Sequence, residues 1–63
     1  MRLSDFWERL EVVVGPAYMA SWGRDIVLPR LDKTVEQAID SGVETSDIWR
    51  AVCEFIEVPG YLK

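Results

Sequence analysis

The chain has 63 residues, of which 49% are hydrophobic, so it can form one small domain with a single core. Its one cysteine and lack of histidine exclude an internal disulfide and the usual zinc sites, which leaves apolar packing to stabilise the fold. A net charge of −4 keeps such a domain soluble and argues against a general electrostatic attraction to nucleic-acid backbones.

The first predicted helix runs from Ser4 to Val14. Its apolar side chains recur at the spacing of one helical face: Leu3, Phe6, Trp7, Leu10, Val13 and Val14. Ser4 is predicted to be the N-cap, and Asp5 places a negative charge near the positive end of the helix dipole. The pair Gly15-Pro16 then ends this helix and begins the next.

The second predicted helix runs from Pro16 or Ala17 to about Leu28, and Pro29 stops it there. Gly23 lies inside this helix, where glycine costs about 1 kcal/mol relative to alanine. We expect a neighbouring tryptophan to pack against this small residue and to offset part of that cost.

After a short predicted linker over residues 30–33, the third helix is expected to begin at Thr34 and to end at Gly42. Thr34 and Gln37 have the spacing of a capping box, in which each side chain bonds to the backbone N–H of the other residue. The side chains expected to face the core are those of Val35, Ala38 and Ile39.

The last predicted helix, from Thr45 or Ser46 to Ile56, is the most apolar of the chain. Thr45 is predicted to be its N-cap, and Asp47 complements its dipole. Two adjacent apolar stripes indicate contact with more than one neighbouring helix: Ile48, Val52, Phe55 and Ile56 in one, and Trp49, Cys53 and Ile56 in the other. The predicted fold class is therefore all-α, a compact bundle of three to four short helices in one domain over residues 1–63.

No group of side chains in the sequence has the composition of a catalytic or metal site. Cys53 has no histidine to act as its base, so we expect it to pack as a small core residue rather than act as a nucleophile. Arg50, one helical turn earlier, is the cation expected to lower its pKa if the thiol is reactive. The carboxylates one turn apart are expected on solvated faces: Asp5 with Glu8, and Glu54 with Glu57. We predict no enzyme activity and no catalytic, cofactor-binding or metal-binding residues.

The three tryptophans are predicted to lie on separate helices: Trp7, Trp22 and Trp49. The simplest interpretation is that they meet in one core. The alternative is that one of them exposes an edge as an anchor for a partner, because tryptophan and arginine dominate the hot spots of protein interfaces. The candidate partner-binding residues are Trp49 with Arg50, followed by Trp22 with Arg24.

The segment from Thr34 to Val52 resembles a helix-turn-helix, with Gly42 at the turn. Gln37 and Ser41 are polar where that motif has hydrophobic residues. The would-be recognition helix exposes one arginine against three carboxylates: Arg50 against Glu44, Asp47 and Glu54. Phosphates repel carboxylates, so this balance disfavours DNA binding. One basic cluster keeps that alternative open: Arg24, Arg30 and Lys33.

Neither a signal peptide nor a membrane span is visible in the sequence, since the longest apolar run is Val12 to Val14. Together with the lone thiol of Cys53, this predicts a cytoplasmic protein that does not act in a membrane. The predicted function is a protein–protein interaction or regulatory module, whose partner is an unidentified protein or a second copy of the chain. The alternative is a helix-turn-helix-like protein associated with DNA.

Stretches over nearly the whole chain resemble one small family: Met1 to Arg9, Gly15 with Ala17-Tyr18, Ser21-Trp22 before Arg24-Asp25, Leu28 with Leu31, Thr34-Val35 with Ala38, Gly42, Ile48 to Cys53, and Val58-Pro59. They are similar to the short actinobacterial proteins grouped as domain-of-unknown-function family number 3046, and the run from Trp49 to Cys53 is the most specific part. The resemblance implies an all-helical fold and an actinobacterial, cytoplasmic origin, with no established activity. Members are often encoded near the recombinase RecA and its modulator RecX, which implies a link to DNA repair by gene neighbourhood and assigns no binding residue.

Overall fold

The computed structural model describes all residues, 1–63, and contains four α-helices and one short hairpin. The helices are α1 (Leu3–Val14), α2 (Met19–Asp25), α3 (Val35–Asp40) and α4 (Thr45–Phe55). The strands β1 (Val27–Leu28) and β2 (Lys33–Thr34) pair antiparallel, and a 3₁₀ turn over Gly60–Leu62, called here the C-terminal turn, ends the chain. The predicted helical fold is confirmed, and the two-residue strands were not predicted.

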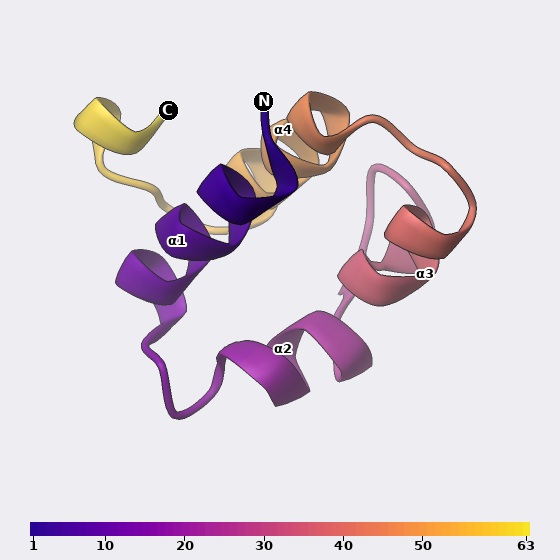
Figure 1. Ribbon diagram of the computed structural model, residues 1–63, viewed down its shortest axis with the longest axis horizontal. Coiled ribbons are helices and arrows are strands. Elements are labelled where there is room, and N and C mark those ends of the chain that lie inside the picture. The colour runs from indigo at the N-terminus through magenta and orange to yellow at the C-terminus, as the bar shows by residue number, and fades with distance from the viewer.

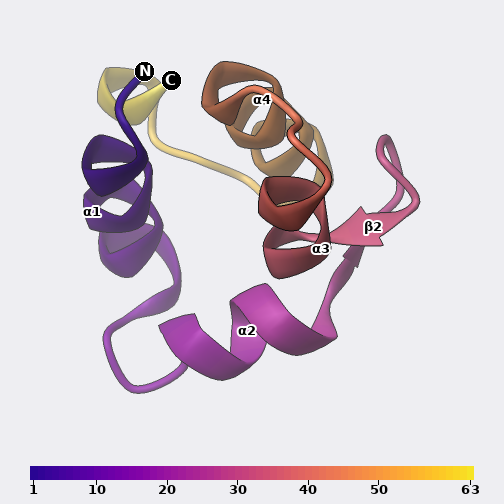
Figure 2. The ribbon, with the colours of Figure 1, turned by 45° about the vertical axis from the view of Figure 1, so that its right-hand side comes forward.

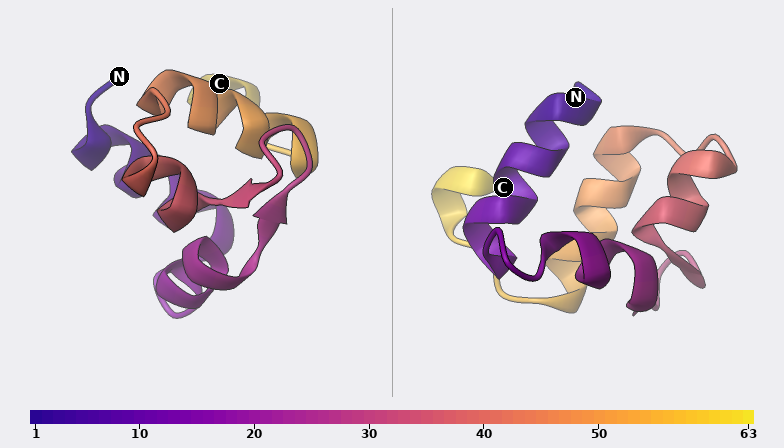
Figure 3. Two further views of the ribbon diagram at one scale, coloured as in Figure 1. Left: turned by 90° about the vertical axis from the view of Figure 1, so that its right-hand side faces the viewer. Right: turned by 60° about the horizontal axis from the view of Figure 1, so that its bottom comes forward.

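The four helices pack in a closed circuit, in which α1 contacts α2, α2 contacts α3, α3 contacts α4, and α4 contacts α1. Figure 1 shows α2 below α1 and α4, with α3 to one side. Figure 2 shows the hairpin leaving α2 and leading into α3. The two views of Figure 3 show the same circuit from the side and from below. None of these helices has the length and apolar character needed to cross a membrane.

Helix α1 begins one residue before the predicted cap. Its N-cap is Arg2, whose carbonyl oxygen accepts the N–H of Phe6 at 3.1 Å, so Ser4 lies inside the first turn. The prediction of Ser4 as N-cap is therefore wrong. The N-cap is the extended residue whose carbonyl oxygen accepts the first hydrogen bond of the helix, whether or not its side chain can also cap. Arg2 has this role although its side chain makes no capping bond.

Helix α2 is shorter than predicted at both ends. Residues 16–18 form a turn before it, and after it Val27 and Leu28 leave the helix to pair with β2. Pro29 disfavours helical backbone at Leu28, and β-branched residues precede it, so this segment is extended. Residues 30–32 of the predicted linker lie at the tip of the hairpin, where Asp32 adopts a left-handed φ of 54°, and its last residue, Lys33, belongs to β2.

Helix α3 has the predicted cap at each end. Thr34 Oγ1 accepts the N–H of Gln37 at 3.1 Å, and Gln37 Oε1 accepts the N–H of Thr34 at 2.9 Å, which confirms the capping box. Beyond the other end, Gly42 has a φ of 84°, and the N–H of Val43 bonds to the carbonyl of Ala38 at 3.0 Å. This is a Schellman motif, and it turns the chain towards α4.

Helix α4 begins at Thr45, but its N-cap is Glu44, and no side chain caps it. The Glu44 carbonyl accepts the N–H groups of Asp47 and Ile48, both at 3.0 Å, so Thr45 is the first helical residue. The prediction of Thr45 as N-cap is wrong by one position. The helix ends at Phe55, and extended backbone follows from Ile56.

The core contains ten buried residues, which come from α1, α3 and α4, from β1 (Leu28) and from the segment after α4 (Val58): Phe6, Leu10, Leu28, Val35, Ala38, Ile48, Trp49, Ala51, Val52 and Val58. Phe6 is fully buried between two indole rings, with its centroid 5.3 Å from that of Trp7 and 5.7 Å from that of Trp49. A Cβ on Gly23 would lie 3.3 Å from Trp7 Cη2, so the expected glycine–tryptophan contact is confirmed. Two tryptophans thus meet around Phe6, whereas Trp22 packs against Phe55 at 6.4 Å.

Candidate functional site

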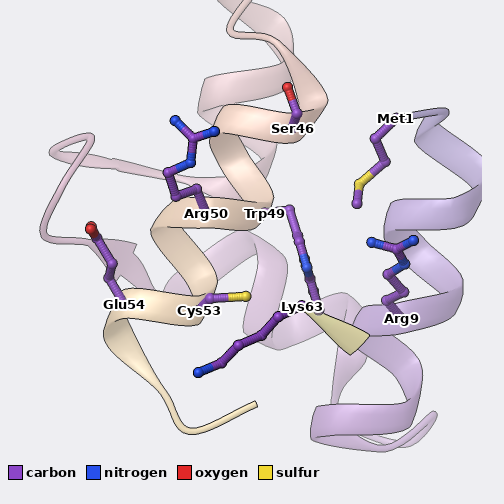
Figure 4. A pocket seen from close by; sticks show the side chains of 8 residues that line it. All are labelled: Met1, Arg9, Ser46, Trp49, Arg50, Cys53, Glu54 and Lys63. Carbon is purple, nitrogen blue, oxygen red and sulfur yellow. The ribbon is translucent and has the colours of Figure 1, made fainter. Parts of the chain in front are cut away.

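A groove of about 460 Å³ lies between α1 and α4 beside the C-terminal turn (Figure 4). It is lined by eight residues: Met1, Arg9, Ser46, Trp49, Arg50, Cys53, Glu54 and Lys63. We call it the α1–α4 groove. Residues 46, 49, 50 and 53 are spaced by three and four positions, which places them on the one face of α4 that borders the groove.

Trp49 forms the inner wall of this groove. Its side chain is 4% exposed, so most of the ring belongs to the core and only an edge reaches the groove. The indole N–H donates to the carbonyl oxygen of Leu62 at 3.0 Å, and this bond holds the C-terminal turn beside α4. The structure therefore gives Trp49 a packing role and leaves little of its ring for a partner.

The charges that line the α1–α4 groove are mostly positive. Arg9, Arg50 and Lys63 come from three separate segments, and Figure 4 shows the Arg9 side chain on α1 facing α4 across the groove. The lining carboxylate, Glu54, accepts a hydrogen bond from Arg30 at 2.5 Å, and this bond also raises the pKa of Arg30. Arg50 lies 3.8 Å from Asp47, a long and exposed contact that leaves its guanidinium free to bind elsewhere.

Cys53 is a free, half-buried thiol whose sulfur points into the α1–α4 groove (Figure 4). Burial raises the pKa of this thiol, and the positive charges of Lys63 and Arg9 partly oppose that rise. Sequence spacing pointed instead to Arg50 as the cation that acts on the thiol. The two cations that do act come from opposite ends of the chain, so only the folded structure brings them together.

A second candidate surface lies along α2 and is called here the α2 aromatic surface. A hollow of about 370 Å³ is lined there by Val14, Tyr18, Ser21, Trp22, Asp25 and Ile26. Tyr18 is 69% exposed, and Trp22 is half-buried against Phe55, which is itself 44% exposed. Tyr18, Trp22 and Ile26 are each four residues apart, so this stripe was present in the sequence, but it was not singled out as a surface.

The four predicted partner-binding residues are divided between the two surfaces. Trp49 and Arg50 line the α1–α4 groove, and Trp22 lines the α2 aromatic surface. Arg24 lines neither, and its exposed guanidinium lies 3.3 Å from the carboxylate of Asp25. The predicted basic cluster is thus partly neutralised, because both of its arginines pair with carboxylates.

The same structure brings together no group of three or more cysteine and carboxylate side chains that could hold a metal ion. No curated protein matches the chain, and no solved structure matches it. A family model described as "Protein of unknown function (DUF3046)" matches residues 1–61 of the 63. The resemblance to this family rested most on the run from Trp49 to Cys53. Three residues of that run, Trp49, Arg50 and Cys53, line the α1–α4 groove, and the other two are buried in the core. Since the match covers nearly the whole chain, the protein belongs to the DUF3046 family of proteins of unknown function.

Proposed function

We propose that this chain is a non-catalytic protein-binding module that contacts its partner through the α2 aromatic surface. The observation that carries the proposal is the exposure of Tyr18, at 69%, beside the half-buried ring of Trp22 and the hollow that both line. Tyrosine and tryptophan supply large contact areas and are enriched among interface hot spots. The free thiol of Cys53 favours a cytoplasmic setting for this activity.

The shape and composition of the α2 aromatic surface suit an apolar side chain of a partner. Val14 and Ile26 add aliphatic walls, whereas Ser21 and Asp25 supply a polar edge. A partially buried apolar centre with a polar rim is the usual anatomy of a protein interface. A second copy of the chain is the alternative partner, because a domain of this size gains much stability from burying exposed aromatic rings.

The experiment compares Tyr18→Ser with a matched control, Tyr61→Ser. Both tyrosines are exposed, at 69% and 81%, but Tyr61 lies on the C-terminal turn, outside the α2 aromatic surface. Affinity capture with the wild-type chain is expected to recover a specific partner that Tyr18→Ser loses and Tyr61→Ser keeps. Sedimentation of the same three proteins tests self-association. A chain that neither captures a partner nor self-associates, or a partner indifferent to Tyr18→Ser, contradicts the proposal.

A second candidate function is binding of DNA by α3 and α4 as a helix-turn-helix-like pair. Its support is the Schellman turn at Gly42, which joins two helices that contact each other. Against it, the exposed face of α4 places Arg50 between the carboxylates of Asp47 and Glu54. A gel-shift assay with duplex DNA at low salt tests this function, and absence of binding there removes it.

A further inference from the structure

We propose that the α1–α4 groove binds a short acidic peptide segment of a partner protein, one that carries an apolar side chain beside its carboxylates. The inference rests on the proposed function as a protein-binding module, but it concerns a different part of the domain. The α1–α4 groove and the α2 aromatic surface have no lining residue in common.

The charge of the groove is opposite to that of the protein. The chain carries a net charge of −4, yet three cations line this groove and one carboxylate does, Glu54. That carboxylate is already engaged by Arg30. Arg50 has only the long contact to Asp47, and Arg9 and Lys63 take part in no ion pair. The groove therefore offers guanidinium and ammonium donors to a carboxylate ligand, and arginine binds carboxylates in a planar, two-pronged geometry.

The floor of the groove is apolar and soft. Figure 4 shows the thioether of Met1, an edge of the Trp49 indole and the thiol of Cys53 facing the same space. Thioether and thiol groups adapt to side chains of different shapes. A volume of about 460 Å³ is at the small end of the range for ligand pockets, roughly 300–1,000 Å³. It suits one apolar side chain with flanking carboxylates and not a whole helix.

A peptide fits these charges better than a nucleic acid does. Duplex DNA presents one negative charge per roughly 1.7 Å of its axis, so it extends well beyond a pocket of this size. Beyond the groove such a ligand meets the exposed carboxylate of Asp47, in addition to that of Glu54, which lines the groove. A short peptide ends before these repulsive contacts accumulate.

The test uses a fluorescein-labelled peptide in which leucine and phenylalanine are flanked on both sides by glutamates, titrated against the full chain. Anisotropy is expected to show saturable binding that weakens as salt rises. Arg9→Gln and Arg50→Gln are each expected to weaken it about tenfold, as loss of a direct charge contact does. Arg24→Gln and Lys33→Gln, which change the net charge equally outside the groove, are the matched controls and leave binding unchanged.

A second measurement locates the peptide in the groove without any substitution. Bound peptide is expected to slow alkylation of Cys53 by iodoacetamide, because the thiol lines the same space. A peptide in which lysine replaces glutamate gives no protection. Three results each overturn the inference: no saturable binding, equal weakening by groove and control variants, or binding of a DNA oligonucleotide in place of the peptide. None of these results affects the comparison of Tyr18→Ser with Tyr61→Ser. The proposal for the α1–α4 groove can therefore be wrong while the proposal for the α2 aromatic surface is right, and the reverse.

Discussion

The indole N–H of Trp49 and the main-chain carbonyl of Leu62 are joined by a hydrogen bond of 3.0 Å. One partner lies in the core and the other in the C-terminal turn, so a single bond connects the packed interior with the segment that brings Lys63 to the α1–α4 groove. The ring also meets Phe6 edge to face at 5.7 Å. Trp49 thereby couples the stability of the core to the shape of the candidate site.

Trp49→Phe is expected to lower the free energy of unfolding by about 1 kcal/mol or somewhat more, because an apolar ring remains but the donor to Leu62 is lost. Urea denaturation measures the change. The control is Trp22→Phe, since the Trp22 indole donates no hydrogen bond within the protein. Amide hydrogen exchange at Leu62 and Lys63 is expected to accelerate in Trp49→Phe alone. Equal exchange in both variants contradicts a role for the bond in holding the C-terminal turn.

Thr34→Ala is expected to destabilise the protein by about 1 kcal/mol, because it removes the side-chain acceptor for the N–H of Gln37. Thr45→Ala is the matched control: Thr45 also stands at the start of a helix, but no side chain caps α4. Its expected effect is within about 0.5 kcal/mol. Thermal or urea unfolding of the two variants measures the difference. A larger loss for Thr45→Ala than for Thr34→Ala contradicts the assignment of caps.

These two threonines also show which features of this fold are predictable from the sequence and which are not. The capping box of Thr34 was predictable because both of its partners lie within one turn of the chain. The N-cap of α4 was predicted one residue too late, at Thr45 instead of Glu44, since these residues are adjacent and only the backbone conformation decides which of them is extended. The helical spacing of apolar residues predicted all four helices. It did not predict the hairpin, because the hairpin depends on pairing between Val27–Leu28 and Lys33–Thr34 across a turn.

The candidate site was less predictable than the fold for a related reason. Trp49 and Arg50 were predicted as partner-binding residues because tryptophan and arginine dominate interface hot spots, and both do line the α1–α4 groove. Arg9 and Lys63 were not predicted to lie near Cys53, since nothing in the local sequence brings either of them to this thiol. Proximity that arises from packing of distant segments leaves no periodic signal. Burial of Trp49 is likewise a property of the circuit of helices and not of its own segment.

Gly23→Leu is expected to lower the free energy of unfolding by about 1–3 kcal/mol through overpacking. A Cβ at this position already lies 3.3 Å from the ring of Trp7, so a larger side chain must displace that ring from Phe6. The gain in helix propensity, about 1 kcal/mol, offsets part of the loss. Ala20→Leu in the same helix is the control, because Ala20 is exposed and should tolerate the change within about 0.5 kcal/mol. If Gly23→Leu and Ala20→Leu change the free energy of unfolding in urea equally, the close contact between Gly23 and Trp7 is excluded.

The pH dependence of stability is expected to show the burial of Cys53. Burial raises the pKa of this thiol in the folded state above its value in the unfolded chain, about 8.5. Below that pH both states keep the proton, and the full stability is present. As the pH rises through the folded pKa, the unfolded chain has already released its proton, so the stability contributed by the neutral thiol is lost. Unfolding in urea from neutral to alkaline pH should therefore show a steeper decline for the wild type than for Cys53→Ala.

Alkylation of native Cys53 gives an independent measure of the same pKa. Its rate against pH should have a midpoint above that of the chain unfolded in urea, because only the thiolate reacts. Arg9→Gln should move the midpoint higher still, since the Arg9 charge lowers the pKa of the folded thiol. Arg24→Gln is the control, because Arg24 pairs with Asp25 and is not among the groups that shift this thiol. A native midpoint at or below the unfolded one would mean that the positive charges outweigh burial. The thiol would then be an activated one, and the expectation that Cys53 acts as a packing residue would be wrong.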